Sequence, residues 1–179
     1  MITKRTRFFL AVEGESERSF ARWLQELCDV ELRLHLDNHV LYGGGYETML
    51  SEAVRLHKKG VTTKGPYKNR FLIVDSDRAD QGDWSLEKLR TEAAKHQMTV
   101  CLQKPKHEAV LFRMIPGKEA IIVPAAGAEA LLKSVWPSYA KPVDARVLRQ
   151  RFNVTDLLRM AALDADFKHL LRTIGLLVE

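Results

Sequence analysis

The first 108 residues of the chain alternate between short apolar runs and longer amphipathic stretches. A short apolar run bounded by turn-forming residues is typical of a strand buried on both faces of a sheet. Apolar residues spaced three and four apart are typical of a helix with one buried face. The pattern predicts strands at residues 7–13, 32–41, 70–74 and 98–102, helices at 16–28, 46–59 and 86–97, and a polar loop at 60–69.

A strand–helix alternation of this kind predicts an α/β fold, with a mainly parallel, four-stranded, Rossmann-like sheet flanked by helices. After Glu108 the alternation gives way to a helical pattern. The elements expected there are helices at residues 107–114, 128–135, 143–151 and 155–174, and a short edge strand at 120–123. We therefore expect an α/β domain at residues 1–117 and a C-terminal helical extension at 118–179 that packs on it.

The composition narrows the class of protein. The chain has 179 residues, of which 46% are hydrophobic and 28% charged, as in ordinary globular proteins. Its two cysteines, Cys28 and Cys101, fall in a predicted helix and a predicted strand, so we expect buried thiols in a reducing compartment. No apolar run approaches the roughly 18 residues of a membrane span, and residues 1–5 lack a signal peptide's apolar region. We expect a cytoplasmic protein without a membrane partner.

Acidic residues follow two of the predicted strands directly. Glu13 ends the first strand, and Asp75 and Asp77 end the strand at residues 70–74. The carboxyl ends of parallel strands share one edge of a sheet, and ligands of α/β sheets bind there. Carboxylates gathered at that edge repel one another unless a cation lies among them, and oxygen ligands favour Mg²⁺ or Mn²⁺ over zinc. Glu17, one turn into the following helix, could reach back toward the same cation.

Each half of this signal has a simpler interpretation. An Asp-x-Asp pair also occurs in solvated turns and helix caps, and acids early in a helix complement its positive N-terminus, which is how we interpret Glu15. The net charge of +5 suits a polyanionic substrate such as nucleic acid, or it reflects solvated surfaces. The basic residues are densest at positions 4–7, 58–59, 64–70, 104–106 and 146–151.

Four short segments resemble a known family. Glu13-Gly14-Glu15-Ser16-Glu17 resembles the E-G-E-x-(T/S)-E signature of RloB-like defence proteins, and Asp75-Ser76-Asp77-Arg78 resembles their D-x-D-R segment. Pro105-Lys106-His107-Glu108 and Tyr139-Ala140-Lys141 resemble their proline–F-E and Y-x-K elements. The resemblance spans residues 7–145 and implies the Toprim fold of topoisomerases, DnaG-type primases and OLD-family nucleases. His107, Val110 and Met114 depart from the family, which usually has Phe, Trp and His there.

The resemblance implies a role for each matched residue. Glu13 would be a catalytic base or a metal ligand, Asp75 and Asp77 would hold the metal, and Glu17 would assist it. The other residues expected at the site are Lys106 and Glu108 for catalysis and Lys64, Lys68, Arg78, Lys104 and Lys141 for nucleic-acid binding.

We therefore expect a metal-dependent nucleic-acid phosphodiesterase, a Toprim-type nuclease of a prokaryotic phage-defence or restriction-type system. A partner ATPase or a homo-oligomer would fit such a system. One alternative is a non-catalytic, Mg²⁺-dependent subunit that binds a nucleotide or nucleic acid within a larger defence complex. Another is a structural partner protein whose acidic residues are only solvated.

Overall fold

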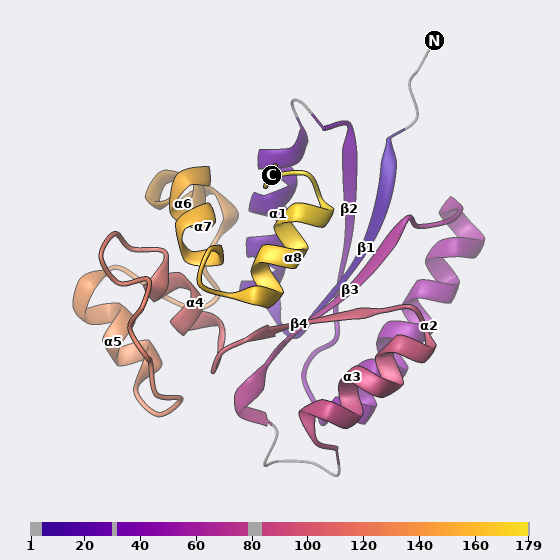
Figure 1. Ribbon diagram of the computed structural model, residues 1–179, viewed down its shortest axis with the longest axis horizontal. Helices are drawn as coiled ribbons and strands as arrows, with labels where there is room; N and C mark the ends of the chain where they lie inside the picture. The colour runs from indigo at the N-terminus through magenta and orange to yellow at the C-terminus, as the bar shows by residue number, and fades with distance from the viewer. Residues whose placement is uncertain (1–4, 30–31, 79–83, 179) are drawn as a thin grey trace.

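The protein folds around one four-stranded parallel sheet with helices on both faces, as the computed structural model shows (Figure 1). The structure describes residues 5–29, 32–78 and 84–178. Its strands are β1 (Thr6–Val12), β2 (Leu34–Val40), β3 (Asn69–Asp75) and β4 (Thr99–Gln103), in the order β2-β1-β3-β4. All three strand pairs are parallel, which confirms the α/β fold class expected from the sequence.

The helices form two unequal layers. They are α1 (Glu15–Asp29), α2 (Tyr46–Lys64), α3 (Leu86–Lys95), α4 (His107–Arg113), α5 (Ala128–Val135), α6 (Ala145–Arg151), α7 (Val154–Ala161) and α8 (Ala165–Thr173), with a 3₁₀ turn, η1 (Ser76–Arg78), after β3. Helices α2 and α3 cover one face of the sheet, whereas α1 and α8 cover the other, with α4 to α7 beyond them (Figure 1). No helix of residues 5–29, 32–78 and 84–178 is long and apolar enough to cross a membrane.

Alternate residues of each strand feed two separate cores. In β1, Leu10 and Val12 point into the core beneath α1, whereas Phe9 and Ala11 point into the core beneath α2 and α3. Buried residues of α5 to α8 join the first core, so residues beyond 118 pack on the same side of the sheet as α1. Cys28 and Cys101 are both buried.

The helix expected at residues 46–59 is longer than predicted, since α2 continues to Lys64. Gly60 marks a close approach rather than a helix end, because a Cβ atom there would clash with the Tyr67 hydroxyl. The helix ends instead at Gly65, which has a left-handed φ of 88°. The loop predicted at residues 60–69 is therefore shorter, because its first residues, up to Lys64, belong to α2.

The predicted edge strand at residues 120–123 is wrong, because no strand forms there. The outer edge of β4 already has partners: Leu102 N donates to Asp166 Oδ2 (3.2 Å), and Arg90 Nη1 donates to Val100 O (3.2 Å). Side chains from α3 and α8 therefore satisfy the backbone groups that a fifth strand would need.

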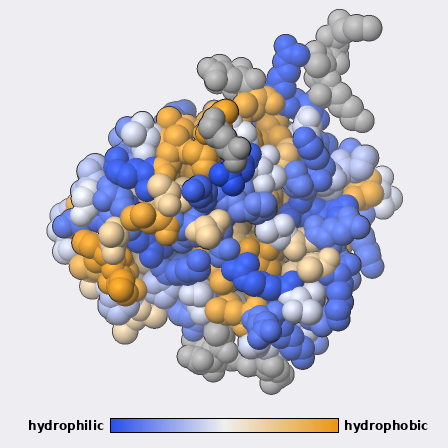
Figure 2. Space-filling view, viewed as in Figure 1, coloured by the Kyte–Doolittle hydropathy of each residue, from blue (hydrophilic) through white to orange (hydrophobic). Residues whose placement is uncertain are grey.

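The single helix predicted at residues 155–174 is also wrong, because the chain breaks it into α7 and α8. Asp164 causes the break: its side chain accepts hydrogen bonds from Asp166 N (3.0 Å) and Phe167 N (3.2 Å), as an N-cap does. On the face drawn in Figure 2, hydrophilic residues dominate over α2 and α3, and one of the hydrophobic patches lies near α5.

Candidate functional site

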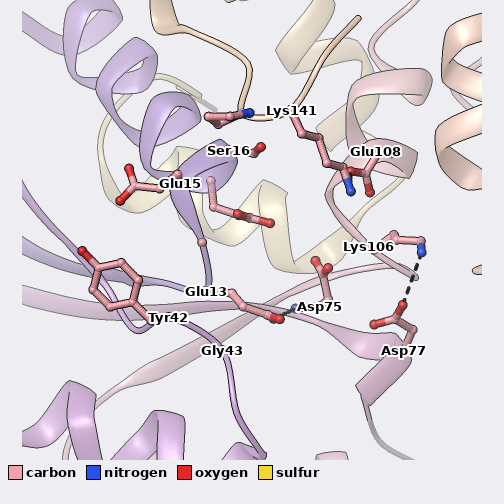
Figure 3. A pocket seen from close by; sticks show the side chains of 13 residues that line it. Glu13, Glu15, Ser16, Tyr42, Gly43, Asp75, Asp77, Lys106, Glu108 and Lys141 are labelled. Atoms are coloured by element: carbon pink, nitrogen blue, oxygen red, sulfur yellow. Dashed lines mark hydrogen bonds and ion pairs between the residues drawn. The ribbon is translucent and has the colours of Figure 1, made fainter.

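A cavity of about 610 Å³ opens at the carboxyl edge of the sheet, where β1 and β3 end. It brings together seven of the residues expected at the site (Figure 3). The residues that line it are Glu13, Gly14, Glu15, Ser16, Glu17, Tyr42, Gly43, Asp75, Asp77, Lys106, Glu108, Lys141 and Pro142. In Figure 3, Glu15 and Tyr42 lie on one side of this cavity and Asp77 and Glu108 on the other, with Glu13 and Asp75 between them. We call it the acidic pocket.

Neighbouring strands place the two central acids. Glu13 follows β1 and Asp75 ends β3, and these strands pair in parallel, so both residues lie at the same edge. The Asp75 backbone N–H donates to Glu13 Oε2 (3.1 Å), which fixes the Glu13 side chain across the strand ends. Gly14 makes room for Glu17, because a Cβ atom at Gly14 would lie 3.0 Å from Glu17 Oε2.

The segment after β3 is tied to the segment after β4. The backbone N–H groups of Ser76 and Asp77 both donate to Pro105 O, at 2.8 and 3.1 Å. Next to this junction, Lys106 Nζ lies 3.7 Å from Asp77 Oδ2, and a dashed line in Figure 3 marks this ion pair. The second Asp of the Asp-x-Asp pair therefore already has a cationic neighbour.

Glu108, in the first turn of α4, is a buried acid with two partners. It forms an ion pair with Lys141 and accepts a hydrogen bond from the Tyr139 hydroxyl at 3.3 Å. Burial alone would raise the pKa of Glu108, but the Lys141 ammonium, a backbone hydrogen bond and the nearby His107 together outweigh burial and lower this pKa. Burial opposes the shift of Lys141 as well, and Glu108 raises the pKa of that amine. Glu108 is therefore ionised and holds Lys141 at the pocket.

Asp75 has the opposite environment. Burial raises the pKa of Asp75, and four neighbouring carboxylates raise it further, to about 9. These neighbours are Glu13, Glu17, Asp77 and Glu108. Within the described part of the chain, the buried Oδ1 atom of Asp75 has no hydrogen-bond partner. The protein alone therefore leaves this carboxyl group either protonated or in need of a cation.

The pocket suits some metals better than others. Among the residues that the structure describes, no three His, Cys, Asp or Glu side chains are arranged to hold a metal ion. A closed zinc cage is therefore not formed by these residues. Mg²⁺ usually keeps several water ligands and is held by one or two carboxylates together with substrate phosphate groups. The oxygen-only donors Asp75 and Asp77, with an orphaned Oδ1 atom, fit such an ion.

Three expected nucleic-acid-binding lysines lie outside the acidic pocket. Lys64 and Lys68 line a hollow of about 360 Å³ near the amino end of β1, together with Arg5 and Arg7. Lys104 pairs instead with the carboxylates of α8, its Nζ lying 3.3 Å from Asp166 Oδ2. The side chain of Arg78 lies outside the described residues.

The structure adds residues that sequence reasoning did not assign. Tyr42 lines the pocket from the loop after β2, and nothing in its local sequence distinguished it from a solvated tyrosine. Tyr139 belongs to the Y-x-K segment, but its contact with Glu108 bridges 31 residues and required the fold. His107 is buried beside Glu108; burial lowers its pKa, and its Nδ1 lies 2.7 Å from Gln103 Nε2.

Comparison of the chain with models of protein families, with curated proteins and with solved structures gave no match. The geometry of the acidic pocket is therefore the basis for assigning a function.

Proposed function

We propose that the protein is a metal-dependent phosphodiesterase that acts on nucleic acid, an RloB-like nuclease of the Toprim type in a prokaryotic phage-defence or restriction-type system. The single observation that carries the proposal is Asp75, whose buried Oδ1 atom has no partner in the described part of the chain. Four other carboxylates surround it, and two lysines lie at the border of the same cavity. A cation and a phosphate group together would satisfy both sets of charges.

Asp75 and Asp77 would hold the ion, with Glu13 and Glu17 beside them. Mg²⁺, or Mn²⁺, supplies Lewis-acid polarisation of a phosphate oxygen when it is bound. The charges favour one place for the substrate, because Lys106 and Lys141 are the cationic residues among the described residues that line the pocket. We therefore expect the phosphodiester group to lie between these lysines and the central acids.

The remaining side chains move protons or balance charge. The Asp75 N–H holds the Glu13 side chain at the strand ends, and Glu13 would act as the base that accepts a proton from an attacking water molecule. Lys106 and Lys141 would offset the negative charge that develops on the phosphate oxygens. Glu108 and Tyr139 position Lys141 for this task.

Cleavage of labelled single-stranded and duplex DNA and RNA, with Mg²⁺ or Mn²⁺, tests the proposal. We expect Glu13→Gln and Asp75→Asn to lower the cleavage rate at least about 100-fold, the usual range for losing a catalytic base or an electrostatic group. Glu92→Gln, a helix-surface change that only removes an ion pair with Lys95, is the matched control and should cleave normally. Cleavage at the native rate by either pocket variant would overturn the assignment.

Thermal unfolding with and without the metal separates this function from the alternatives. An ion present at 100 times its Kd stabilises the folded protein by about 2.7 kcal/mol, so the melting temperature should rise. The rise should vanish in Asp75→Asn/Asp77→Asn. Metal-dependent binding of nucleic acid without turnover would instead identify a binding subunit of a larger complex. No metal response and no binding of nucleic acid would leave a structural protein with solvated acids.

A further inference from the structure

Tyr42 is an exposed aromatic residue at the rim of the acidic pocket. Its relative exposure is 80%, whereas the other three tyrosines of the chain are buried. Figure 3 shows its ring on the side of the pocket opposite Asp77. Among the described residues, no aromatic ring and no cation packs against it. The ring therefore contributes little to the folded core.

The backbone at Tyr42 is in the left-handed region, with φ of 58°. This conformation is unfavourable for a residue with a Cβ atom, and glycine adopts it without strain. Two hydrogen bonds hold the segment there: Leu41 N donates to Val12 O (2.9 Å), and Gly43 N donates to Glu13 O (3.2 Å). The chain thus holds an exposed aromatic ring in a strained position beside Glu13. Strain of this kind concentrates at sites of function.

A second, basic hollow borders the acidic pocket at the same tyrosine. Tyr42 lines both cavities, and the second one also contains Arg18, His39 and Arg55. Arg55 already pairs with Glu52 in this hollow (2.6 Å), and Arg18 Nη1 lies 3.5 Å from Glu15, but the Arg18 Nε atom has no hydrogen-bond partner among the described residues. Tyr42 therefore lies between the proposed site for a cation with a phosphate group and a hollow in which Arg18 Nε can still donate to the next phosphate.

We propose that Tyr42 is a stacking platform for an unpaired nucleobase of the bound strand. The inference rests on the proposed function and names its substrate class: single-stranded or locally unpaired nucleic acid. Aromatic side chains stack on single-stranded bases of any sequence, because every base has a π-face. A base in a regular duplex has both faces covered by its neighbours, so a continuous duplex offers Tyr42 nothing to stack on.

Binding of dye-labelled oligonucleotides, measured by fluorescence anisotropy with Ca²⁺ in place of Mg²⁺ to limit cleavage, tests the inference. We expect Tyr42→Ala to bind single-stranded DNA about 5- to 150-fold more weakly, and Tyr42→Phe to bind it as the native protein does. An abasic strand of equal length should bind the native protein and Tyr42→Ala equally. Ile122→Ala, at a residue that is 93% exposed outside both cavities, is the control and should change nothing.

Stability distinguishes a binding role from a structural one. Tyr42→Gly relieves the left-handed strain, so its melting temperature should equal the native value or exceed it by up to about 4 °C, while binding falls as in Tyr42→Ala. A clear fall in melting temperature would show that the ring packs structurally and would overturn the inference.

The two proposals fail in different ways. If the native protein binds single-stranded DNA and Tyr42→Ala binds it equally well, the stacking role is wrong and the proposed function stands. If the native protein prefers intact duplex, the substrate class is wrong. If it binds no DNA or RNA at all, both proposals are wrong.

Discussion

Two aspartates on the strands that flank β1 meet opposite environments. Asp37 on β2 is buried, yet both of its oxygens have donors: the Tyr67 hydroxyl lies 2.6 Å and Arg7 Nη2 lies 2.8 Å from Oδ2, and Lys64 Nζ lies 3.3 Å from Oδ1. Burial alone would raise the pKa of Asp37, but these partners together lower it to about 2. Asp75 on β3 has a pKa raised to about 9 and an oxygen without a donor among the described residues.

The difference separates an acid that completes the fold from an acid that is left for a ligand. The donors around Asp37 come from β1, the end of α2 and the loop that follows it, so the chain neutralises this charge itself. Around Asp75 the chain places further acids instead, which raises the free energy of the ligand-free state. Only a proton or a cation can offset that cost. The comparison predicts substitutions with opposite effects on stability.

The largest effect is expected for Asp37→Asn. The change leaves the nearly buried guanidinium of Arg7 without its carboxylate, so we expect the free energy of unfolding to fall by about 3 kcal/mol. Urea unfolding at pH 7 measures it. Because the pKa of Asp37 is lowered, its stabilisation is present above the ordinary pKa of 3.8 and is lost as the pH falls toward 2. An unchanged unfolding midpoint would show that the Asp37 network is unimportant.

Asp75→Asn is expected to stabilise the protein, in contrast to Asp37→Asn. In metal-free buffer with a chelator at pH 7.5, we expect Asp75→Asn to raise the free energy of unfolding by about 2 kcal/mol. At this pH Asp75 must take up a proton on folding, whereas Asn needs none, and this difference accounts for the gain; the buried amide, which lacks partners, reduces it. Glu92→Gln serves again as the surface control and should have no effect. Destabilisation by Asp75→Asn would mean that the carboxylate is satisfied in the native protein.

The same carboxyl group gives the native protein a pH dependence. Because the folded pKa of Asp75 exceeds the unfolded value, the folded state binds the extra proton between about pH 4 and pH 9. Its contribution to stability is therefore fully present below pH 4 and is lost as the pH rises toward 9. Metal-free unfolding across this range should show a downward slope that Asp75→Asn reduces and that saturating Mg²⁺ offsets at the alkaline end.

The strands and the edge at which the acids meet could be predicted from sequence, because both follow from local order. Apolar runs specify the strands, and parallel pairing then brings Glu13 and Asp75 to one edge whatever the details of packing. The breaks at Gly60 and Asp164 were misjudged because each depends on a partner that the local pattern does not show. For Gly60 this partner is the Tyr67 ring, and for Asp164 it is the pair of backbone N–H groups, of Asp166 and Phe167, at the start of a new helix.

Charge partners were the least predictable part of the site. Lys64 and Lys68 follow a basic stretch that suggested nucleic-acid binding, yet the fold turns Lys64 toward Asp37, 27 residues away. Lys106 and Lys141 lie at the acidic pocket because the segments after β4 and α5 return to it. The exposure and the backbone strain of Tyr42 depend on the path of the loop after β2, and the local sequence does not predict that path.

The smallest effects on stability are expected when the tyrosine hydroxyls that donate to Asp37 and Glu108 are removed. Tyr67→Phe removes the 2.6 Å hydrogen bond to Asp37, and Tyr139→Phe removes the 3.3 Å hydrogen bond to Glu108, which keeps its ion pair with Lys141. We expect about 1 kcal/mol or less of lost stability for Tyr139→Phe and a larger loss for Tyr67→Phe, measured by urea unfolding at pH 7.

For metal-dependent cleavage we expect the opposite order, with the larger loss in Tyr139→Phe. The Asp37 network lies outside the acidic pocket, so Tyr67→Phe should leave metal-dependent cleavage unchanged at temperatures where the protein stays folded. Tyr139→Phe loosens Glu108 and with it Lys141, so cleavage should slow several-fold although the fold is nearly unaffected. Equal cleavage by both variants would show that Glu108 and Lys141 form a second structural ion pair. The acidic pocket would then be limited to Asp75 and the carboxylates beside it.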